Sequence, residues 1–293
     1  YLNITSNNVS ASSEFFMSRS PLPTDTRAVS PIVGTVLTVA LLIIVAASIG
    51  VTSVSFVDEA EEPLKQYEHR VECEKPDGST DIPTAGLVGH YTFDNPDLGT
   101  DESGESNHGE AIGGQTTSGA GLCAGDALNP DGDGMHIEID DFPGPDSGLT
   151  ISAWIKPDDV TSSDGQRIFA DDVGTGYALS LNDGGDKRLR FYNRDGSPVS
   201  LDTEQIIEKG NWYHVVAVYD ADGGRRAIYV DGVEEISMSG DPSLATSGTA
   251  SIGGEPEASG ETMYFDGVID EVRVYDRPLS EREIGALEDQ IYR

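Results

Sequence analysis

The chain has 293 residues, and its 52 Asp and Glu side chains outnumber its 18 Lys and Arg side chains, giving a formal net charge of −34. A carboxylate-rich surface repels other anions, so this balance argues against nucleic acid or anionic lipid as a partner. Molar salt screens such charges at contact range. The composition therefore indicates a protein adapted to high salt rather than a specific acidic binding patch.

The segment from Val29 to Val57 carries no charged side chain. About 20 apolar residues are enough to cross a bilayer as a helix, so this segment predicts a single transmembrane helix. Arg27 precedes it, and Asp58 and Glu59 follow it. Because Lys and Arg favour the cytoplasmic side of a span, we expect the N-terminus inside, and the rest of the chain as an extracellular domain of a cell-membrane protein.

The chain begins with Tyr1, and Met17 is the natural start, so we interpret residues 1–28 as a leader or an over-extended N-terminus. Ser30 can cap a helix whose first turn begins at Pro31, where a missing N–H costs nothing.

The residues around the start of the predicted span, RAVSPIVG at 27–34, resemble the N-terminus of archaeal type IV pilin-like proteins, particularly those of halophilic archaea. The resemblance implies cleavage by a prepilin peptidase between Ala28 and Val29, and assembly with other pilin subunits in a pilus. The early Glu of bacterial pilins is absent, so bacterial assembly rules do not transfer. An uncut signal anchor is the alternative.

Residues 58–84 are charged, contain three prolines and show no sustained apolar period, which predicts an acidic stalk or linker. The two cysteines, Cys73 and Cys123, both fall on the oxidising side of the predicted membrane. We expect a disulfide between them, which would tie the stalk to the outer domain and add about 4 kcal/mol of stability. Two free buried thiols are the alternative, because the sequence does not give the distance between their Cα atoms.

From residue 85 onward, short β-branched and aromatic segments alternate with Gly, Asn and Asp turns, which predicts a β-sandwich. The clearest unit is a hairpin from Trp212 to Gly232 with its turn at residues 221–224. Ser280 and Glu283 form a capping box for a short C-terminal helix. Other expected strands cover Leu87 to Phe93, Thr150 to Ile155, Arg167 to Ala170, Tyr177 to Leu181 and Leu189 to Tyr192.

Four stretches in order, LVGHYTFD, LTISAWIKPDD, NWYHVVAVYD and FDGVIDEVRVYDRPLSEREIGAL, resemble laminin-G-like domains of the concanavalin A-like lectin/glucanase superfamily. The resemblance covers about residues 85 to 287 and implies a mainly β fold, an antiparallel jelly-roll sandwich with its first and last strands adjacent. The predicted organisation is therefore a leader (1–28), a transmembrane or pilin-like helix (29–57), a stalk (58–84) and a laminin-G-like domain (85–293).

Many such domains hold a calcium ion where the first strand meets the last, and the resemblance implies four ligands here: Asp94, Asp101, Asn107 and Asp270. Strand parity gives a separate argument, because Asp270 falls on the same face as Val268 and Val272. A carboxylate buried there without a partner would cost several kcal/mol, and oxygen ligands suit calcium. Alternatively, Asp270 accepts hydrogen bonds from backbone amides of the Asn107 turn without a metal. We interpret 131–134, DGDG, as a strand-entry turn.

Some members of this superfamily are glycoside hydrolases with an E-x-D-x-x-E motif, whose carboxylates flank the sugar bond. Glu138 and Asp140 give the nearest match, but the third carboxylate is missing and Pro143 ends the strand. His214 alternates with valines and is expected to be a packed strand residue. We therefore expect no enzyme activity.

Carbohydrate binding requires an exposed aromatic platform with polar neighbours. Tyr177, Arg190 and Tyr192 are candidates, although the same residues would also suit a covered sheet face. The leading hypothesis is a membrane-anchored or pilus-associated surface protein whose outer domain binds a glycan or a surface protein in adhesion. A structural filament subunit without ligand binding is the alternative, and a hydrolase is the third class.

Overall fold

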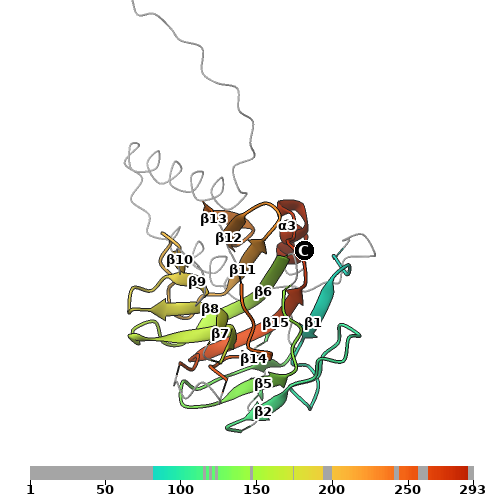
Figure 1. The fold of residues 1–293 in the computed structure, drawn as a ribbon. Helices are drawn as coiled ribbons and strands as arrows, with labels where there is room; N and C mark the ends of the chain where they lie inside the picture. Colours follow the sequence, from blue (N-terminus) through green and yellow to red (C-terminus); the bar gives the residue numbers. More distant parts are fainter. Residues whose placement is uncertain are drawn as a thin grey trace, which may run out of the picture. The chain divides into compact units, whose positions relative to one another are not determined.

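The computed structural model describes residues 82–289, apart from 115–116, 119–120, 123–124, 146–147, 174, 194–199, 241–243 and 257–262. Two antiparallel sheets lie face to face in this part of the chain (Figure 1). The antiparallel β-sandwich predicted from the sequence is confirmed.

Sheet A contains both ends of the domain. In spatial order it consists of β13 (Val233–Ser239), β12 (Arg225–Val230), β11 (Tyr213–Asp220), β6 (Gly148–Pro157), β15 (Gly267–Tyr275), β4 (Ala127–Leu128) and β3 (Thr117–Ser118). The first strand, β1 (Leu87–Tyr91), pairs with the last, β15, through partners from Leu87 opposite Tyr275 to Tyr91 opposite Val272. The predicted adjacency of first and last strands is confirmed.

Sheet B is built from the middle of the chain. Its order is β10 (Ser200–Asp202), β9 (Leu189–Asn193), β8 (Gly176–Asp183), β7 (Asp164–Asp172), β14 (Thr249–Ile252), β5 (His136–Asp140) and β2 (Glu110–Ile112). Residues 131–134 lie just before β5, and Asp131 forms an isolated bridge with Asp266. This is the strand-entry position predicted for the DGDG segment.

The hydrophobic core lies between the sheets, because alternate residues of each strand point inward. Ile151, Ile155 and Ile269 of sheet A and Leu179 and Phe191 of sheet B are all fully buried in one apolar cluster. The intervening residues of each strand face outward. One face of each sheet is therefore available for a second layer or for a ligand.

Helix α3 (Glu281–Asp289) supplies that second layer over part of sheet A. Its Ile284 and Leu287 pack against Val216 and Val218 of β11. The predicted capping box is present, since the Ser280 amide donates to the Glu283 carboxylate at 2.8 Å and the Glu283 amide donates to the Ser280 hydroxyl at 3.4 Å. The bond satisfies amides that the first helical turn leaves free.

A bulge in β15 contradicts the predicted parity of Asp270. The pairing of β15 with β6 shifts between Asp270 and Arg273, and Glu271 adopts a left-handed φ of 50°. The extra residue reverses the alternation, so Val272 joins Ile269 in the core while Asp270 lies opposite Trp154, on the outer face. The prediction that Asp270 shares a face with Val272 is wrong, although Asp270 is only 3% exposed.

The predictions for the N-terminal part fall outside the described residues. These are the leader with its Ala28–Val29 cleavage point, the span at 29–57, and the stalk up to residue 81 with Cys73. The other cysteine of the predicted disulfide, Cys123, also lies outside the described residues. Among residues 82–289, as far as they are described, no helix is both long and apolar enough to cross a membrane.

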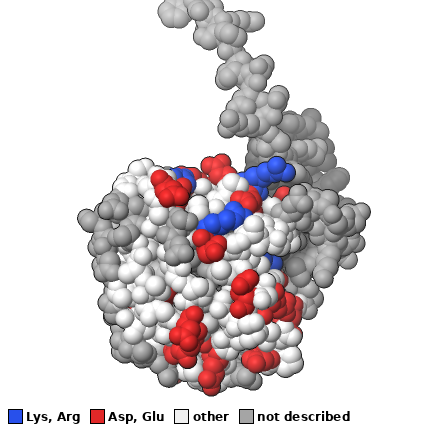
Figure 2. Space-filling view, turned by 45° about the vertical axis from the view of Figure 1, so that its right-hand side comes forward, with Lys and Arg blue, Asp and Glu red and all other residues white. Residues whose placement is uncertain are grey.

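The acidic composition is visible on the surface. Figure 2 shows Asp and Glu side chains spread over one face of the molecule, with few Lys and Arg side chains among them. Because Lys and Arg are few, a buried or half-buried Arg side chain is a distinctive feature of this domain.

Candidate functional site

The outer face of sheet B carries a row of polar side chains that runs across four strands. The register places Arg167 of β7 opposite Ser180 of β8, Ser180 opposite Arg190 of β9, and Arg190 opposite Asp202 of β10. These residues share a face because side chains alternate along each strand, with buried Leu179 on the other side. We call this row and the groups bonded to it the arginine layer.

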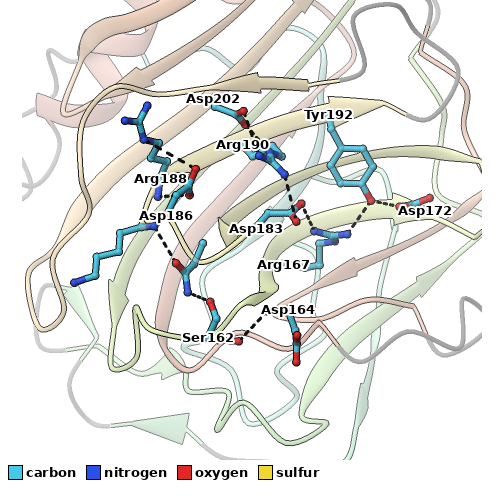
Figure 3. A network of polar contacts seen from close by, with 12 residues as sticks. Ser162, Asp164, Arg167, Asp172, Asp183, Asp186, Arg188, Arg190, Tyr192 and Asp202 are labelled. Carbon is cyan, nitrogen blue, oxygen red and sulfur yellow. Dashed lines mark hydrogen bonds and ion pairs between the residues drawn. The ribbon is translucent and has the colours of Figure 1, made fainter.

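Arg167 is the centre of the arginine layer and is 2% exposed. Its Nε donates to Glu255 at 2.7 Å. Its Nη1 lies 3.4 Å from Asp183, and its Nη2 donates to the Tyr192 hydroxyl at 3.0 Å (Figure 3). Glu255 is fully buried. The Tyr192 hydroxyl in turn donates to the carboxylate of Asp172, which is also fully buried.

The electrostatics of Arg167 follow from these contacts. Burial lowers the pKa of a guanidinium, but Tyr192, Glu255 and Asp183 more than offset that effect, and the pKa of Arg167 rises above its ordinary value. Burial also raises the pKa of the Tyr192 hydroxyl, so it stays protonated and can donate to Asp172. Arg167 is therefore a permanent buried cation held by an internal set of acceptors.

Arg190 forms the exposed border of the arginine layer. Its side chain is 25% exposed and lies 2.5 Å from Asp202 and 3.4 Å from Asp183 (Figure 3). The hydrogen bond with Asp202 is the main reason why the pKa of Arg190 is raised. Asp183 contacts both guanidiniums, one with each carboxylate oxygen. Asp183 is 22% exposed and Asp202 is 33% exposed, so a molecule in solution can reach both of them.

The turn between β8 and β9 fixes the position of Asp183. Asn182 and Gly184 both have positive φ, of 61° and 102°, a conformation that Gly adopts freely and Asn adopts more readily than most residues. The Asn182 side chain accepts the Lys187 amide at 2.9 Å and donates to the Ser162 carbonyl. The DGGD sequence of this turn thus places Asp183 between the two arginines.

Two of the three predicted sugar-binding side chains lie in the arginine layer. Tyr192 packs with Ala170 and Ala178 on the outer face, and the Arg167 guanidinium lies 4.8 Å from its ring centre. Tyr177 is instead fully buried between the sheets and stacks on Phe169 at 6.5 Å. Tyr177 therefore cannot serve as an exposed platform, and Tyr192 is only 7% exposed, so the covered-face alternative holds for both tyrosines.

Asp101 and Asn107, two of the four predicted calcium ligands, hold a turn against β1. The Asp101 carboxylate accepts the amides of His90, Ser103 and Asn107 at 2.9, 2.9 and 3.0 Å, and the Ser103 hydroxyl at 2.7 Å. The Asn107 side chain donates to the Val88 carbonyl at 2.6 Å. These bonds occupy the carboxylate oxygens of Asp101, whereas Asn107 bonds to Val88 through its side-chain nitrogen and not through its oxygen.

Asp94 and Asp270, the other two predicted ligands, both contact the 121–126 segment. Asp94 accepts the Asp126 amide at 2.9 Å, and Asp270 accepts the amides of Leu122 and Glu271 at 2.8 and 2.7 Å. Amide bonding to Asp270 was the metal-free alternative, but the donors are not in the Asn107 turn. Each carboxylate keeps oxygen lone pairs that suit calcium.

The described residues contain no group of three or more His, Cys, Asp or Glu side chains that could hold a metal ion. Calcium at Asp94 and Asp270 therefore stays a prediction.

Burial and the neighbouring Glu271 and Asp94 carboxylates raise the pKa of Asp270 to about 8, although two amides stabilise its ionised form. Glu271 behaves in the opposite way. Burial opposes its charge, but the hydrogen bond from His90 at 3.1 Å and the guanidinium of Arg273 at 2.7 Å lower its pKa to about 2. The sequence offered no signal for the contacts of Glu271 with His90 and Arg273, because they depend on the bulge in β15.

The two carboxylates of the hydrolase alternative, Glu138 and Asp140, are alternate residues of β5. Glu138 is half-buried beside His136 at 3.7 Å, and Asp140 is exposed. His214 lies on the other sheet, with its Nε2 2.8 Å from the Ser152 hydroxyl and its ring stacked on Trp154 at 5.1 Å. Burial lowers the pKa of His214 to about 3. The prediction of a packed strand residue is confirmed for His214.

The sandwich and its polar outer face define a lectin-like jelly-roll domain. The chain belongs to the concanavalin A-like lectin/glucanases superfamily, whose Laminin_G_3 model matches residues 131–285, more than half of the chain. A search of curated protein sequences found no match.

Several solved structures are similar. Domain 4 of AbnA, an extracellular GH43 arabinanase from Geobacillus stearothermophilus solved in complex with arabinotriose, is 26% identical with a TM-score of 0.55; the match covers 71% of this chain and 98% of that domain. The binding domain of Paraclostridial Mosquitocidal Protein 1 is 17% identical with a TM-score of 0.54, covering 69% of this chain and 52% of that one.

The ligand binding domain of botulinum neurotoxin serotype D, solved with N-acetylneuraminic acid, is 15% identical with a TM-score of 0.53, covering 70% of this chain and 51% of that one. The match thus spans about half the length of each toxin domain, and at these identities it shows the fold alone.

Removing Arg167 tests whether the arginine layer is a coupled buried network. Arg167→Met leaves the Glu255 carboxylate buried without its cation, which should cost about 3–5 kcal/mol of unfolding free energy. The double variant Arg167→Met, Glu255→Met should recover most of that loss. The measurement is denaturant-induced unfolding in molar salt.

The matched control is Arg225→Met, which breaks the ion pair between Arg225 and Glu234. The side chains of Arg225 and Glu234 are 34% and 30% exposed. An exposed pair contributes about 0–1 kcal/mol. A loss at Arg167 no larger than the loss at Arg225 would contradict the buried network.

The raised pKa of Asp270 predicts a pH-dependent stability. Because the folded pKa of about 8 lies above the ordinary Asp value of about 3.9, the folded state binds more protons between these two pH values, and stability falls as pH rises through them. In a chelating buffer, the unfolding free energy of the wild type, measured relative to Asp270→Asn, should fall by a few kcal/mol as pH rises from about 4 to about 8. The expected slope is about 1.4 kcal/mol per pH unit. A flat or rising difference would refute this assignment.

Calcium should act in the opposite direction at the same residue, because a bound cation favours the ionised carboxylate. Added calcium should therefore raise the unfolding temperature of the wild type more than that of Asp270→Asn near pH 8. An equal response of the two proteins would count against calcium at Asp270.

Proposed function

We propose that the domain binds an oligosaccharide on the outer face of sheet B. The observation that carries the proposal is the match to the arabinanase domain, which extends over 98% of a domain solved with arabinotriose. That domain was solved in complex with the sugar, and the structure describes a domain of similar fold here.

The chemistry of the arginine layer supports this location. A sugar hydroxyl can donate one hydrogen bond and accept others. Asp183 and Asp202 offer acceptors at the exposed border, and Arg190 offers donors between them. Hydrogen bonds with charged partners are about twice as strong as neutral ones. The border can therefore both accept hydrogen bonds from sugar hydroxyls and donate hydrogen bonds to them.

The rigidity of the arginine layer also favours recognition. Arg167 and Tyr192 lie behind the border and are bonded to Glu255, Asp172 and Asp183. Side chains that are already ordered lose little entropy when a ligand arrives. Little of the binding free energy at the border is then lost to ordering the protein side chains.

We also propose that the domain is displayed outside the cell for adhesion, anchored by the uncharged segment at 29–57. The length of that segment and the charges on its two sides support this proposal. N-terminal sequencing of the membrane-extracted protein is the test. A terminus at Val29 would support pilin-like processing, a retained leader would support a plain anchor, and recovery only in the salt-soluble fraction would refute anchoring.

The test of glycan binding uses the full chain in detergent and molar salt, titrated with arabinotriose by calorimetry. Wild type should bind, and Arg190→Gln should weaken binding about tenfold or more, because a hydrogen bond from a charged donor is worth about 1.5–3 kcal/mol.

Arg225→Gln is the matched control, because Arg225 is a similarly exposed arginine paired with one carboxylate on sheet A. It should leave the affinity unchanged. Equal losses in the two variants, or no binding of any neutral oligosaccharide by the folded wild type, would refute the proposal.

A further inference from the structure

The charges of the arginine layer are unequal in number. Arg167 and Arg190 provide two cations, while Asp183, Asp202 and Glu255 provide three carboxylates in direct contact with them. Asp172 adds a fourth carboxylate, which accepts the Tyr192 hydroxyl. Both guanidiniums therefore already have anionic partners, and the layer has a net negative charge.

The part of the layer that a ligand can reach also has twice as many carboxylates as cations. Arg167, Glu255 and Asp172 are 2%, 0% and 0% exposed. The accessible border consists of Arg190 and its two carboxylate partners, Asp183 and Asp202, which are 22% to 33% exposed. A ligand thus meets one cation between two anions.

An acidic sugar would face two obstacles at this border. Its carboxylate or sulfate would have to displace Asp183 or Asp202 from Arg190, and the displaced group would remain close by. Like charges brought together at an interface cost several kcal/mol. The net charge of −34 adds repulsion on approach, although molar salt screens that long-range part.

A neutral sugar meets no such obstacle. Its hydroxyls can donate to Asp183 and Asp202 and accept from Arg190 without breaking the existing pairs, since each carboxylate accepts about four hydrogen bonds.

We propose that the border formed by Asp183, Arg190 and Asp202 selects neutral, hydroxyl-rich oligosaccharides and rejects uronates and sulfated sugars. This selectivity rests on the proposed function and adds the class of ligand to it.

The experiment includes one pair of ligands that differ only at C6. The full chain is titrated in molar salt with arabinotriose, with α-linked galactotriose and with trigalacturonate, which carries carboxylates in place of the primary alcohols of galactotriose. Wild type should bind galactotriose at least about tenfold more tightly than trigalacturonate, a difference of about 1.4 kcal/mol.

The double variant Asp183→Asn, Asp202→Asn keeps side chains of nearly the same size at the border and removes its negative charges. We expect it to bind trigalacturonate at least as tightly as it binds the neutral sugar. Glu234→Gln, which neutralises a similarly exposed carboxylate on sheet A, should retain the wild-type ratio. Circular dichroism establishes that each variant is folded.

The outcomes separate the two claims. Wild type that binds trigalacturonate as well as the neutral sugars, or an Asp183→Asn, Asp202→Asn variant with an unchanged ratio, overturns the selectivity while glycan binding stands. Wild type that binds none of the three sugars while folded overturns both the selectivity and the proposed function.

Discussion

The arrangement of this domain depends on one buried cation. The guanidinium of Arg167 is 2% exposed on the outer face of sheet B, and three partners from other segments surround it: Glu255, Asp183 and Tyr192. A buried charge is tolerated only when it is paired and hydrogen-bonded. Each of these partners must therefore occupy a fixed place, which brings together segments up to 88 residues apart in the sequence.

The fixed places explain why the border is ordered. Asp183 bonds to Arg167 with one oxygen and lies against Arg190 with the other. The position of the exposed Arg190 is therefore set by the buried Arg167 through a shared carboxylate. A binding surface built on such a support pays little ordering entropy when a ligand binds. The same arrangement leaves an excess of carboxylates, from which the preference for neutral sugars follows.

Much of the fold was predictable from local pattern. The hairpin at β11 and β12, the capped helix α3 and the adjacency of β1 and β15 all follow from residues close in sequence or from the resemblance to laminin-G-like domains. Arg190 and Tyr192 were predictable as candidates, because both stand in a strand with alternating apolar residues. Tyr177 was not distinguishable from them, since an aromatic residue in a strand suits either face.

The rest required tertiary structure. Asp270 was placed on the core face because a regular strand alternates, whereas the positive φ of Glu271 reverses the alternation at that point. No sequence signal marked the bulge. The partnership of Arg167 and Glu255 depends on the approach of β7 to the segment after β14, which is a property of the sheet order. Contacts between residues so far apart in the sequence cannot be predicted from a short segment of it.

The central claim is that the outer face of sheet B holds a neutral oligosaccharide at the border of the arginine layer. A crystal structure of the protein with arabinotriose tests it most directly. The account predicts sugar hydroxyls within hydrogen-bond distance of Arg190 and of Asp183 or Asp202. A sugar bound elsewhere, for example beside Asp94 and Asp270 at the other sheet, with the arginine layer untouched, would contradict it.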